Sequence, residues 1–343
     1  MRVLVIGGTM FIGRLLVAEL LKAGHEVTVL HRKPKHDLGR KVQNLMADRN
    51  DPKSLRDALR FSNFQVVFDN VYDWERGTTA AQVESTAQAV MATSGDRLSR
   101  YVFMSSVAAY GDGLNHHDGD PLAPDDHGDP YARNKAMSER TLFRMHQNTG
   151  FPVVTLRPPF IYGPENPFYR EAFFWDRLRE NRPIVLPGDG YRLMQFVYIK
   201  DLVKACIRAM DEPGAVGEAF NVANEKPLTQ AEFVQAVAAA AGKKANIVRV
   251  PRERIAEASG DSKRVELRQP AGQPTYFGVY LDVAPITEVV VKAKRILGFQ
   301  PTPFEVGLKE TYRWYTRKTK KAKIDYGFED RLIEMASVAP AAD

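Results

Sequence analysis

Tyr131 and Lys135 are the side chains in this sequence whose types and spacing are best suited to chemistry. At an interval of four residues on a helix they lie on one face, and Glu139 continues the same row. A phenol with a pKa of about 10 exchanges protons poorly at neutral pH, and a nearby ammonium group favours the phenolate. The pattern predicts that Tyr131 transfers a proton and that Lys135 lowers its pKa.

A glycine-rich turn near the start of the chain predicts a phosphate-binding site. The unbroken apolar run Val3 to Ile6 leads directly into residues 7–13, GGTMFIG, and a helical pattern follows. Glycines allow backbone N–H groups to close on a pyrophosphate at the start of a helix. The alternative is a tight turn without a ligand. The cofactor-binding residues expected here are Gly7, Thr9, Met10, Phe11, Ile12 and Gly13.

The end of the second predicted strand, Val27 to Leu30, indicates which dinucleotide is bound. An acidic residue there would bind the adenosine ribose, but the sequence continues with His31, Arg32 and Lys33. A cationic cluster suits the 2′-phosphate of NADP. We therefore expect NAD(P) as cofactor, with NADP favoured over NAD. The alternative is that Arg32 and Lys33 are solvated loop charges.

Alternating strand and helix patterns in the first half of the chain predict an α/β fold. They are typical of a doubly wound, parallel Rossmann sheet with a smaller C-terminal α/β lobe that binds the substrate. The expected divisions are a Rossmann domain at 1–165, a lobe at 166–315 and a basic, mobile tail at 316–343. Strands near 195–200 are candidates to join the core sheet. Buried strands are expected at Val3–Ile6, Val27–Leu30, Val66–Phe68, Tyr101–Met104 and Val153–Leu156, with helices over Thr78–Thr93 and from about Tyr131.

Composition and charge exclude several classes of protein. The single cysteine, Cys206, excludes an intramolecular disulfide and indicates a reducing compartment. No apolar run approaches the roughly 20 residues needed to span a bilayer, so we expect a cytoplasmic protein with no membrane contact. The net charge is +6, and the excess lies between Arg313 and Lys323. A solvated helix end is the favoured interpretation of that segment, and an RNA-binding face is the alternative.

Other stretches resemble the extended short-chain dehydrogenase/reductase family, which contains the NAD-dependent epimerases and dehydratases. They are SSVAAYG at 105–111, RPPFIYGP at 157–164, FVYIKD at 196–201 and KRILGF at 294–299. With the glycine turn and the Tyr131–Lys135 pair, the resemblance covers residues 1–315. The family's catalytic serine or threonine lies four residues before the tyrosine of the first stretch. The resemblance therefore implies Ser106, rather than Ser105, as the third catalytic residue.

The resemblance also implies contacts with the cofactor and the substrate. Two positions depart from the family pattern. Met10 replaces the usual middle glycine of the turn, where a side chain would crowd the diphosphate. Met194 replaces an arginine that grips the substrate's diphosphate, for which Arg192 on the same strand face could substitute. The implied residues are Asp48 and Arg49 for the adenine edge, Lys135, Pro158 and Phe160 for the nicotinamide half, and Ser106, Tyr162 and Arg192 for the substrate.

For function, the resemblance implies an NAD(P)-dependent epimerase, dehydratase or reductase that acts on a sugar nucleotide or a similar hydroxylated small molecule. It also implies a homodimer. The departures, together with DNVYDW at 69–74, are most similar to a branch that includes a chloroplast stem-loop RNA-binding protein. The alternative is therefore a dinucleotide-binding protein that acts as an RNA-binding or RNA-processing factor. The intact Ser106, Tyr131 and Lys135 favour the enzyme.

Two other segments have simpler interpretations. The long loop Asp112 to Asp129 contains three histidines, but their spacing is not that of a metal site, and no metal is predicted. We expect this loop to be a flexible lid near the substrate. The aromatic-rich stretch Phe168 to Leu178 is expected to be a helix in the lobe core or at a dimer face.

Overall fold

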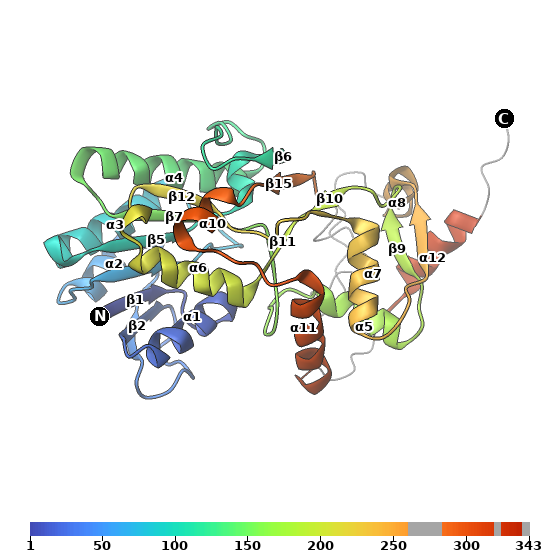
Figure 1. Cartoon of the computed structure of the whole chain (residues 1–343), viewed down its shortest axis with the longest axis horizontal. Helices are drawn as coiled ribbons and strands as arrows, with labels where there is room; N and C mark the ends of the chain where they lie inside the picture. Colours follow the sequence, from blue (N-terminus) through green and yellow to red (C-terminus); the bar gives the residue numbers. More distant parts are fainter. Residues whose placement is uncertain (260–282, 319–323, 338–343) are drawn as a thin grey trace. The chain divides into compact units, whose positions relative to one another are not determined.

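A computed structural model of the chain describes residues 1–259, 283–318 and 324–337. The chain forms two compact units (Figure 1). The first unit comprises Met1–Ile161, Phe196–Glu225 and Ile286–Thr302, and the second comprises Tyr162–Gln195, Lys226–Pro285 and Pro303–Asp343. These units differ from the expected divisions at 165 and 315, because later segments of the chain return to the first unit.

A seven-stranded parallel sheet forms the centre of the first unit, in the order β12-β7-β5-β4-β1-β2-β3. The order reverses between β1 and β4, which leaves a crevice at the carboxyl ends of these two strands. The predicted doubly wound Rossmann sheet is confirmed. Its strands are β1 (Arg2–Ile6), β2 (Glu26–His31), β3 (Gln43–Met46), β4 (Val66–Asp69), β5 (Arg100–Met104), β7 (Val153–Arg157) and β12 (Glu218–Asn221).

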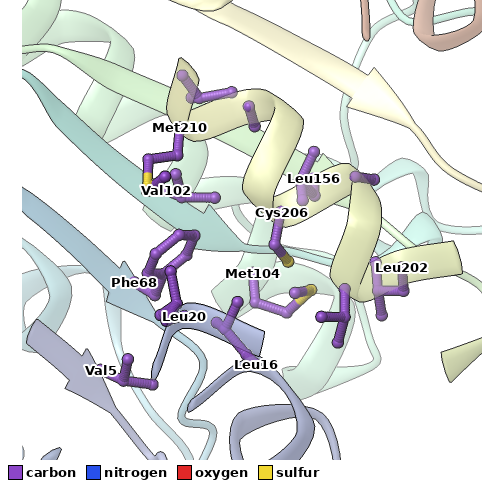
Figure 2. Packing of buried hydrophobic residues seen from close by; sticks show 14 of the residues in the cluster. Val5, Leu16, Leu20, Phe68, Val102, Met104, Leu156, Leu202, Cys206 and Met210 are labelled. Atoms are coloured by element: carbon purple, nitrogen blue, oxygen red, sulfur yellow. The ribbon is translucent and has the colours of Figure 1, made fainter. Parts of the chain in front are cut away.

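Helices cover both faces of this sheet, because successive strand side chains point to opposite faces and both sets are apolar. On one face, strand residues pack against α1 (Phe11–Lys22), α6 (Ile199–Asp211) and α10 (Val291–Leu297). Figure 2 shows Cys206 of α6 directed toward the strands, with its sulfur close to Met104 of β5. Burial of each such side chain stabilises the fold by about 1.5–3 kcal/mol.

The opposite face of the sheet packs against α2 (Pro52–Leu59), α3 (Ala80–Ser94) and α4 (Pro130–Thr149). The strand residues on this face include Leu4 and Val67, which alternate with those of the first face. Short 3₁₀ turns occur at Gly95–Arg97, Val107–Tyr110 and Pro213–Ala215.

One expectation about a later strand is wrong. The strand near 195–200, β11 (Phe196–Tyr198), pairs with β8 (Phe160–Tyr162), and β12 occupies the sheet edge instead. The expected lid at 112–129 contains β6 (Gly113–His116), which pairs with β15 (Ile286–Glu288). Backbone hydrogen bonds to a distant strand hold residues 113–116 in place, and the mobility expected of the rest of the loop stays a prediction.

The second unit is the expected α/β lobe. In its helical part, α7 (Gln230–Ala240) packs against α5 (Glu171–Arg179) and α11 (Phe304–Lys318). The helix expected from Phe168 begins at Glu171, and its aromatic side chains Phe173 to Trp175 lie in the core of this unit. The strand pairs are β9 (Ile184–Pro187) with β14 (Ile247–Val250), and β10 (Leu193–Met194) with β13 (Leu228–Thr229).

The segment expected to be a mobile tail contains a helix, α12 (Gly327–Ser337). It packs with α8 (Arg252–Ser259) and β14, because Phe328 and Leu332 bury apolar surface in that cluster. Buried Glu329 of α12 accepts a 2.7 Å hydrogen bond from Arg177. The rest of the expected tail, 319–323 and 338–343, lies outside the described residues. No helix within the described ranges is long and apolar enough to cross a membrane.

Candidate active site

Helix α4 positions Tyr131 and Lys135. Asp129 caps the helix, and its carboxylate accepts hydrogen bonds from the backbone N–H groups of Tyr131 at 2.9 Å and Ala132 at 3.4 Å. Pro130 occupies the first turn, where its missing N–H costs nothing. Tyr131 therefore lies in a first turn that the cap stabilises, and Lys135 lies one turn further along the same face.

Tyr131 meets Ser106, which follows the carboxyl end of β5. Burial raises the pKa of Tyr131 to about 12, and the hydrogen bond with the Ser106 side chain opposes that rise. The Ser106 hydroxyl also accepts a 3.2 Å hydrogen bond from the backbone N–H of Ala108. In the free chain, loss of hydration raises the pKa of Tyr131 more than the Ser106 hydrogen bond lowers it, so the phenol is neutral at physiological pH. The lowering of this pKa by Lys135 together with a cationic nicotinamide stays a prediction for the cofactor-bound enzyme.

Lys135 is buried, with 5% of the residue exposed. Its ammonium group donates a 2.7 Å hydrogen bond to the backbone carbonyl of Met104 and lies 5.9 Å from the centre of the Tyr131 ring. It also lies over the rings of Phe103 and Tyr72, at 4.9 Å and 5.5 Å. Burial lowers the pKa of Lys135 to about 8, against the opposing charge of nearby Asp69. The side chain therefore still carries its charge at neutral pH.

Glu139, the third member of the row, has a different environment. It forms a buried ion pair with Arg157 at 2.6 Å, and it accepts a 2.5 Å hydrogen bond from the Ser105 hydroxyl. Arg157 also donates to the Tyr110 hydroxyl at 2.5 Å. These contacts connect α4 to the carboxyl ends of β5 and β7, so they fix the position of Ser106 relative to Tyr131.

The glycine turn has the conformation that a phosphate-binding loop requires. Gly7 adopts φ +82°, and a Cβ on Gly13 would lie 2.0 Å from the carbonyl oxygen of Gly7, so side chains are excluded at both positions. Helix α1 begins after Met10, whose side chain makes no capping hydrogen bond and is 63% exposed. The first N–H groups of α1 are therefore left for an anion. Thr9 and Ile12 are half-buried, and Phe11 is buried.

Buried polar atoms beside this turn fit a polar ligand. Within the described ranges, both amide atoms of Asn70, Nε2 of His31 and Oδ1 of Asn50 are buried without a hydrogen-bond partner. Such groups in native proteins are nearly always hydrogen-bonded. Asn70 follows β4 and His31 ends β2, so both lie at the carboxyl edge of the sheet near the crevice. These residues fit a bound dinucleotide.

The cations expected to contact the adenosine half of the cofactor differ in their exposure to solvent. The side chain of Arg32 is 60% exposed and its Nη1 lies 3.6 Å from the Asp73 carboxylate, and Lys33 is exposed. Arg49 is buried and forms an ion pair with Asp69, so the expectation of an adenine contact by Arg49 is wrong. The cause is the buried carboxylate at the end of β4, which binds the guanidinium group.

Asp48 remains next to the surface. Its carboxylate accepts a 2.9 Å hydrogen bond from the backbone N–H of Asn50 and lies 3.5 Å from Arg76. Two residues of the expected nicotinamide segment also lie in the first unit. The Pro158 carbonyl accepts a 3.0 Å hydrogen bond from the N–H of Val107, and half-buried Phe160 packs against Phe196.

Two expected substrate residues lie in the second unit. Tyr162 is fully buried, and its hydroxyl donates to the carbonyl of Phe304. The expectation that Tyr162 contacts substrate is therefore wrong, because its ring belongs to the core of that unit. Arg192 donates a 2.8 Å hydrogen bond to the carbonyl of Val283.

The loop after β4 brings to the site residues that were not predicted. Trp74 stacks on the Tyr131 ring with centroids 4.8 Å apart, and Tyr72 contacts the same ring edge-on at 4.7 Å. A signal was present in the sequence, because the polar and aromatic stretch DNVYDW directly follows a buried strand. Loops at the carboxyl end of a parallel strand commonly bind ligands.

Comparisons with known proteins show the family to which the chain belongs. The family model of the NAD dependent epimerase/dehydratase family matches residues 3–223. The chain is 29% identical to the chloroplast stem-loop binding protein of 41 kDa b of Arabidopsis thaliana, over 97% of this chain and 84% of the relative. It is 25% identical to a 3-beta-hydroxysteroid dehydrogenase of Mycolicibacterium neoaurum, over 92% and 91%.

The fold is shared with solved structures. The UDP-glucose 4-epimerase of Thermotoga maritima, determined with UDP-glucose, superposes with a TM-score of 0.72 and 21% identity, covering 92% of this chain and 99% of that one. The match to the family model spans the glycine turn, Ser106, Tyr131 and Lys135. The chain belongs to the NAD dependent epimerase/dehydratase family and is an enzyme of that family.

Proposed function

We propose that this enzyme epimerises, dehydrates or oxidises a sugar nucleotide by hydride transfer at Tyr131, Lys135 and Ser106. The observation that carries this proposal is the meeting of these three side chains in the unit that also holds the glycine turn. Further relatives whose names are those of nucleotide-sugar dehydratases and a nucleotide-sugar decarboxylase support the substrate class.

Each residue has a distinct role in the proposed reaction. A nicotinamide dinucleotide bound at the glycine turn supplies the hydride acceptor and, when oxidised, a positive charge. Tyr131 would first lose its phenol proton to solvent when the cofactor's positive charge lies beside it, and the phenolate would then take the proton of the substrate hydroxyl whose carbon loses hydride, which leaves a ketone and a neutral phenol. Ser106 donates a hydrogen bond to the substrate oxygen and holds it beside the phenol. Lys135 would stabilise the Tyr131 phenolate that this step requires, and it would hold the nicotinamide ribose. In an epimerase, hydride would return to the opposite face of the ketone carbon, and Tyr131 would return the proton to the oxygen.

A panel of substrates tests the proposal. UDP-glucose, UDP-glucuronic acid and dTDP-glucose are incubated with the enzyme and with NAD or NADP, and products are followed by NMR while absorbance at 340 nm reports net reduction. We expect conversion of at least one sugar nucleotide. Conversion with no lasting absorbance indicates epimerisation or dehydration, whereas a growing signal indicates net oxidation. Failure of every sugar nucleotide, with turnover of a hydroxysteroid instead, would refute the substrate class.

For the cofactor, we propose a preference for NADP over NAD. Exposed Arg32 and Lys33 follow β2 with no carboxylate at the strand end, although Asp73 lies near Arg32. Arg32→Glu should weaken NADPH binding far more than NADH binding, because only NADPH presents a phosphate to this cation. Arg40→Glu, at another exposed arginine, is the control. Equal losses for both dinucleotides in calorimetric titrations would refute the preference.

A second candidate function is RNA binding. It is supported by the name of the Arabidopsis relative and by the basic segment 313–323, of which 319–323 lies outside the described residues. Filter binding of a stem-loop RNA across a salt series tests it. Affinity that falls steeply with salt, combined with no turnover of any sugar nucleotide, would favour RNA binding over the enzyme.

We also propose a homodimer that pairs α3 and α4 with the same helices of a second copy. These helices pack side by side, and small residues such as Ala81 and Ala92 are exposed on α3. A closed two-fold bundle is the commonest way to bury such faces. Light scattering at micromolar concentration should give twice the chain mass, and Ala81→Glu with Ala92→Glu should give the monomer. A monomeric parent protein would refute it.

A further inference from the structure

The loop after β4 builds a wall of two aromatic residues against the proposed catalytic tyrosine. We call Tyr72 and Trp74 the aromatic wall. The Trp74 ring lies nearly parallel to the Tyr131 ring, at an angle of 28°, and the Tyr72 ring is edge-on to both. Although it stacks on Tyr131, Trp74 is 64% exposed. A large aromatic surface is therefore open to solvent directly beside the phenol.

Hydrogen bonds hold this wall in place before any ligand binds. Asp73 lies between the two wall residues, and its carboxylate accepts hydrogen bonds from the N–H groups of Glu75 at 3.0 Å and Arg76 at 3.1 Å. The N–H of Asp73 donates to the Thr78 hydroxyl at 3.0 Å. The Tyr72 hydroxyl accepts a 3.3 Å hydrogen bond from Asn134, on the same helix as Tyr131. The wall is thus tied both to its own turn and to α4.

A preformed, exposed indole beside a proton-transferring group favours a particular kind of ligand. The face of an aromatic ring carries partial negative charge, and the C–H groups on one face of a pyranose ring are weakly positive. Such a ring packs well on an indole, whereas a small acyclic alcohol has no flat face to offer. Because the reacting hydroxyl must reach Tyr131, the ring that bears it comes close to Trp74.

We propose that Trp74 is a specificity-determining residue that packs against the sugar ring whose hydroxyl reacts at Tyr131. This inference rests on the proposed function, because it takes Tyr131 as the proton-transferring group. Packing of this kind is present before the reaction and in the transition state alike. Its loss therefore raises KM and changes kcat little.

The test compares Trp74→Ala, Trp74→Phe and the parent enzyme, with the sugar nucleotide turned over fastest among UDP-glucose, UDP-glucuronic acid and dTDP-glucose. Phe61→Ala is the control, because Phe61 is 91% exposed and its ring lies 5.4 Å from the Arg60 guanidinium carbon. We expect Trp74→Ala to raise KM by about 5- to 100-fold, the range for loss of an aromatic stacking surface. Trp74→Phe should lie between it and the parent enzyme, and Phe61→Ala should match the parent.

Two further readouts separate this role from others. NADH affinity and the melting temperature should stay unchanged in Trp74→Ala, because the side chain is exposed. A fall in kcat with unchanged KM would overturn the inference, since Trp74 would then only hold the Tyr131 ring. Unchanged KM and kcat would also overturn it, while turnover by the parent enzyme would leave the proposed function intact. A parent enzyme that converts none of the three sugar nucleotides would overturn both.

Discussion

Two buried cations differ in their surroundings: Lys135 of α4, and Arg157 of β7, which contacts α4 at Glu139, one turn after Lys135. Arg157 is paired with Glu139 and hydrogen-bonded to Tyr110. Burial alone would lower the pKa of Arg157, but the Glu139 carboxylate and the Tyr110 hydroxyl together outweigh this and raise that pKa above its ordinary value. Lys135 has one backbone carbonyl and three aromatic faces, and burial lowers its pKa to about 8. A buried cation paired with a carboxylate keeps its charge and stabilises the fold. The pKa of a buried cation that lacks such a partner depends more on the charge of a ligand that binds beside it.

The largest expected effect is on turnover, and it comes from a substitution beside Lys135. Tyr131→Phe keeps the ring and its stacking but removes the group that transfers the proton. Turnover should fall by about 100- to 10,000-fold, while NADH affinity and the melting temperature stay near those of the parent. Steady-state assays with an accepted sugar nucleotide measure the first, and fluorescence titration measures the second. Full activity in Tyr131→Phe would remove Tyr131 from the mechanism.

Loss of the ion pair between Arg157 and Glu139 should instead reduce the stability of the fold. Arg157→Met leaves the Glu139 carboxylate buried without its partner, which should cost about 3–5 kcal/mol of unfolding free energy. Lys294→Met removes an exposed pair with Glu225, at 2.8 Å, and should cost about 0–1 kcal/mol. Urea unfolding of both variants provides the comparison. Equal losses would show that burial does not distinguish these two pairs.

The pH dependence of stability sharpens the comparison at Lys135. Its pKa is about 8 in the folded chain and about 10.4 when unfolded, so between these values the unfolded chain binds the extra proton. The Lys135 contribution to stability is therefore present above the unfolded pKa and is lost as pH falls to about 8. Relative to Lys135→Met, the unfolding free energy of the parent should rise by about 1.4 kcal/mol per pH unit in this window. Parallel pH profiles would contradict this.

The smallest expected effect concerns the start of α4. Asp129→Ala removes the cap that bonds to the N–H groups of Tyr131 and Ala132, and it should cost about 1 kcal/mol. Asp126→Ala, at an exposed neighbouring position, should change the unfolding free energy by less than about 0.5 kcal/mol. Thermal melts of both variants decide whether the first turn depends on this cap.

Periodic and local signals in the sequence were sufficient for much of this structure. The buried strand before the glycine turn, the helix that begins near Tyr131 and the doubly wound sheet follow from the alternation of strand and helix patterns, from turn chemistry and from the spacing of four. The same spacing brings Tyr131, Lys135 and Glu139 onto one face. Ser106 needed the family resemblance, because two adjacent serines, Ser105 and Ser106, follow the same strand.

Contacts between distant segments could not be predicted in this way. Arg49 pairs with Asp69, and Tyr162 lies beneath Gly307, where a Cβ would come within 2.3 Å of its hydroxyl. Both side chains were assigned to ligands because their neighbours in sequence resemble ligand-binding segments. Trp74 was missed because the meaning of an aromatic residue in a loop depends on which ring it meets, and Tyr131 is far away in the sequence.

The position of β12 at the edge of the sheet has a consequence for synthesis on the ribosome. β7 is complete at Arg157, but the strand that pairs with its free edge begins at Glu218. At about 5–20 residues per second, several seconds pass in which the nascent sheet presents an unpaired, apolar edge. Such edges readily pair with other chains. Slower translation of residues 158–217 would lengthen this interval and increase aggregation.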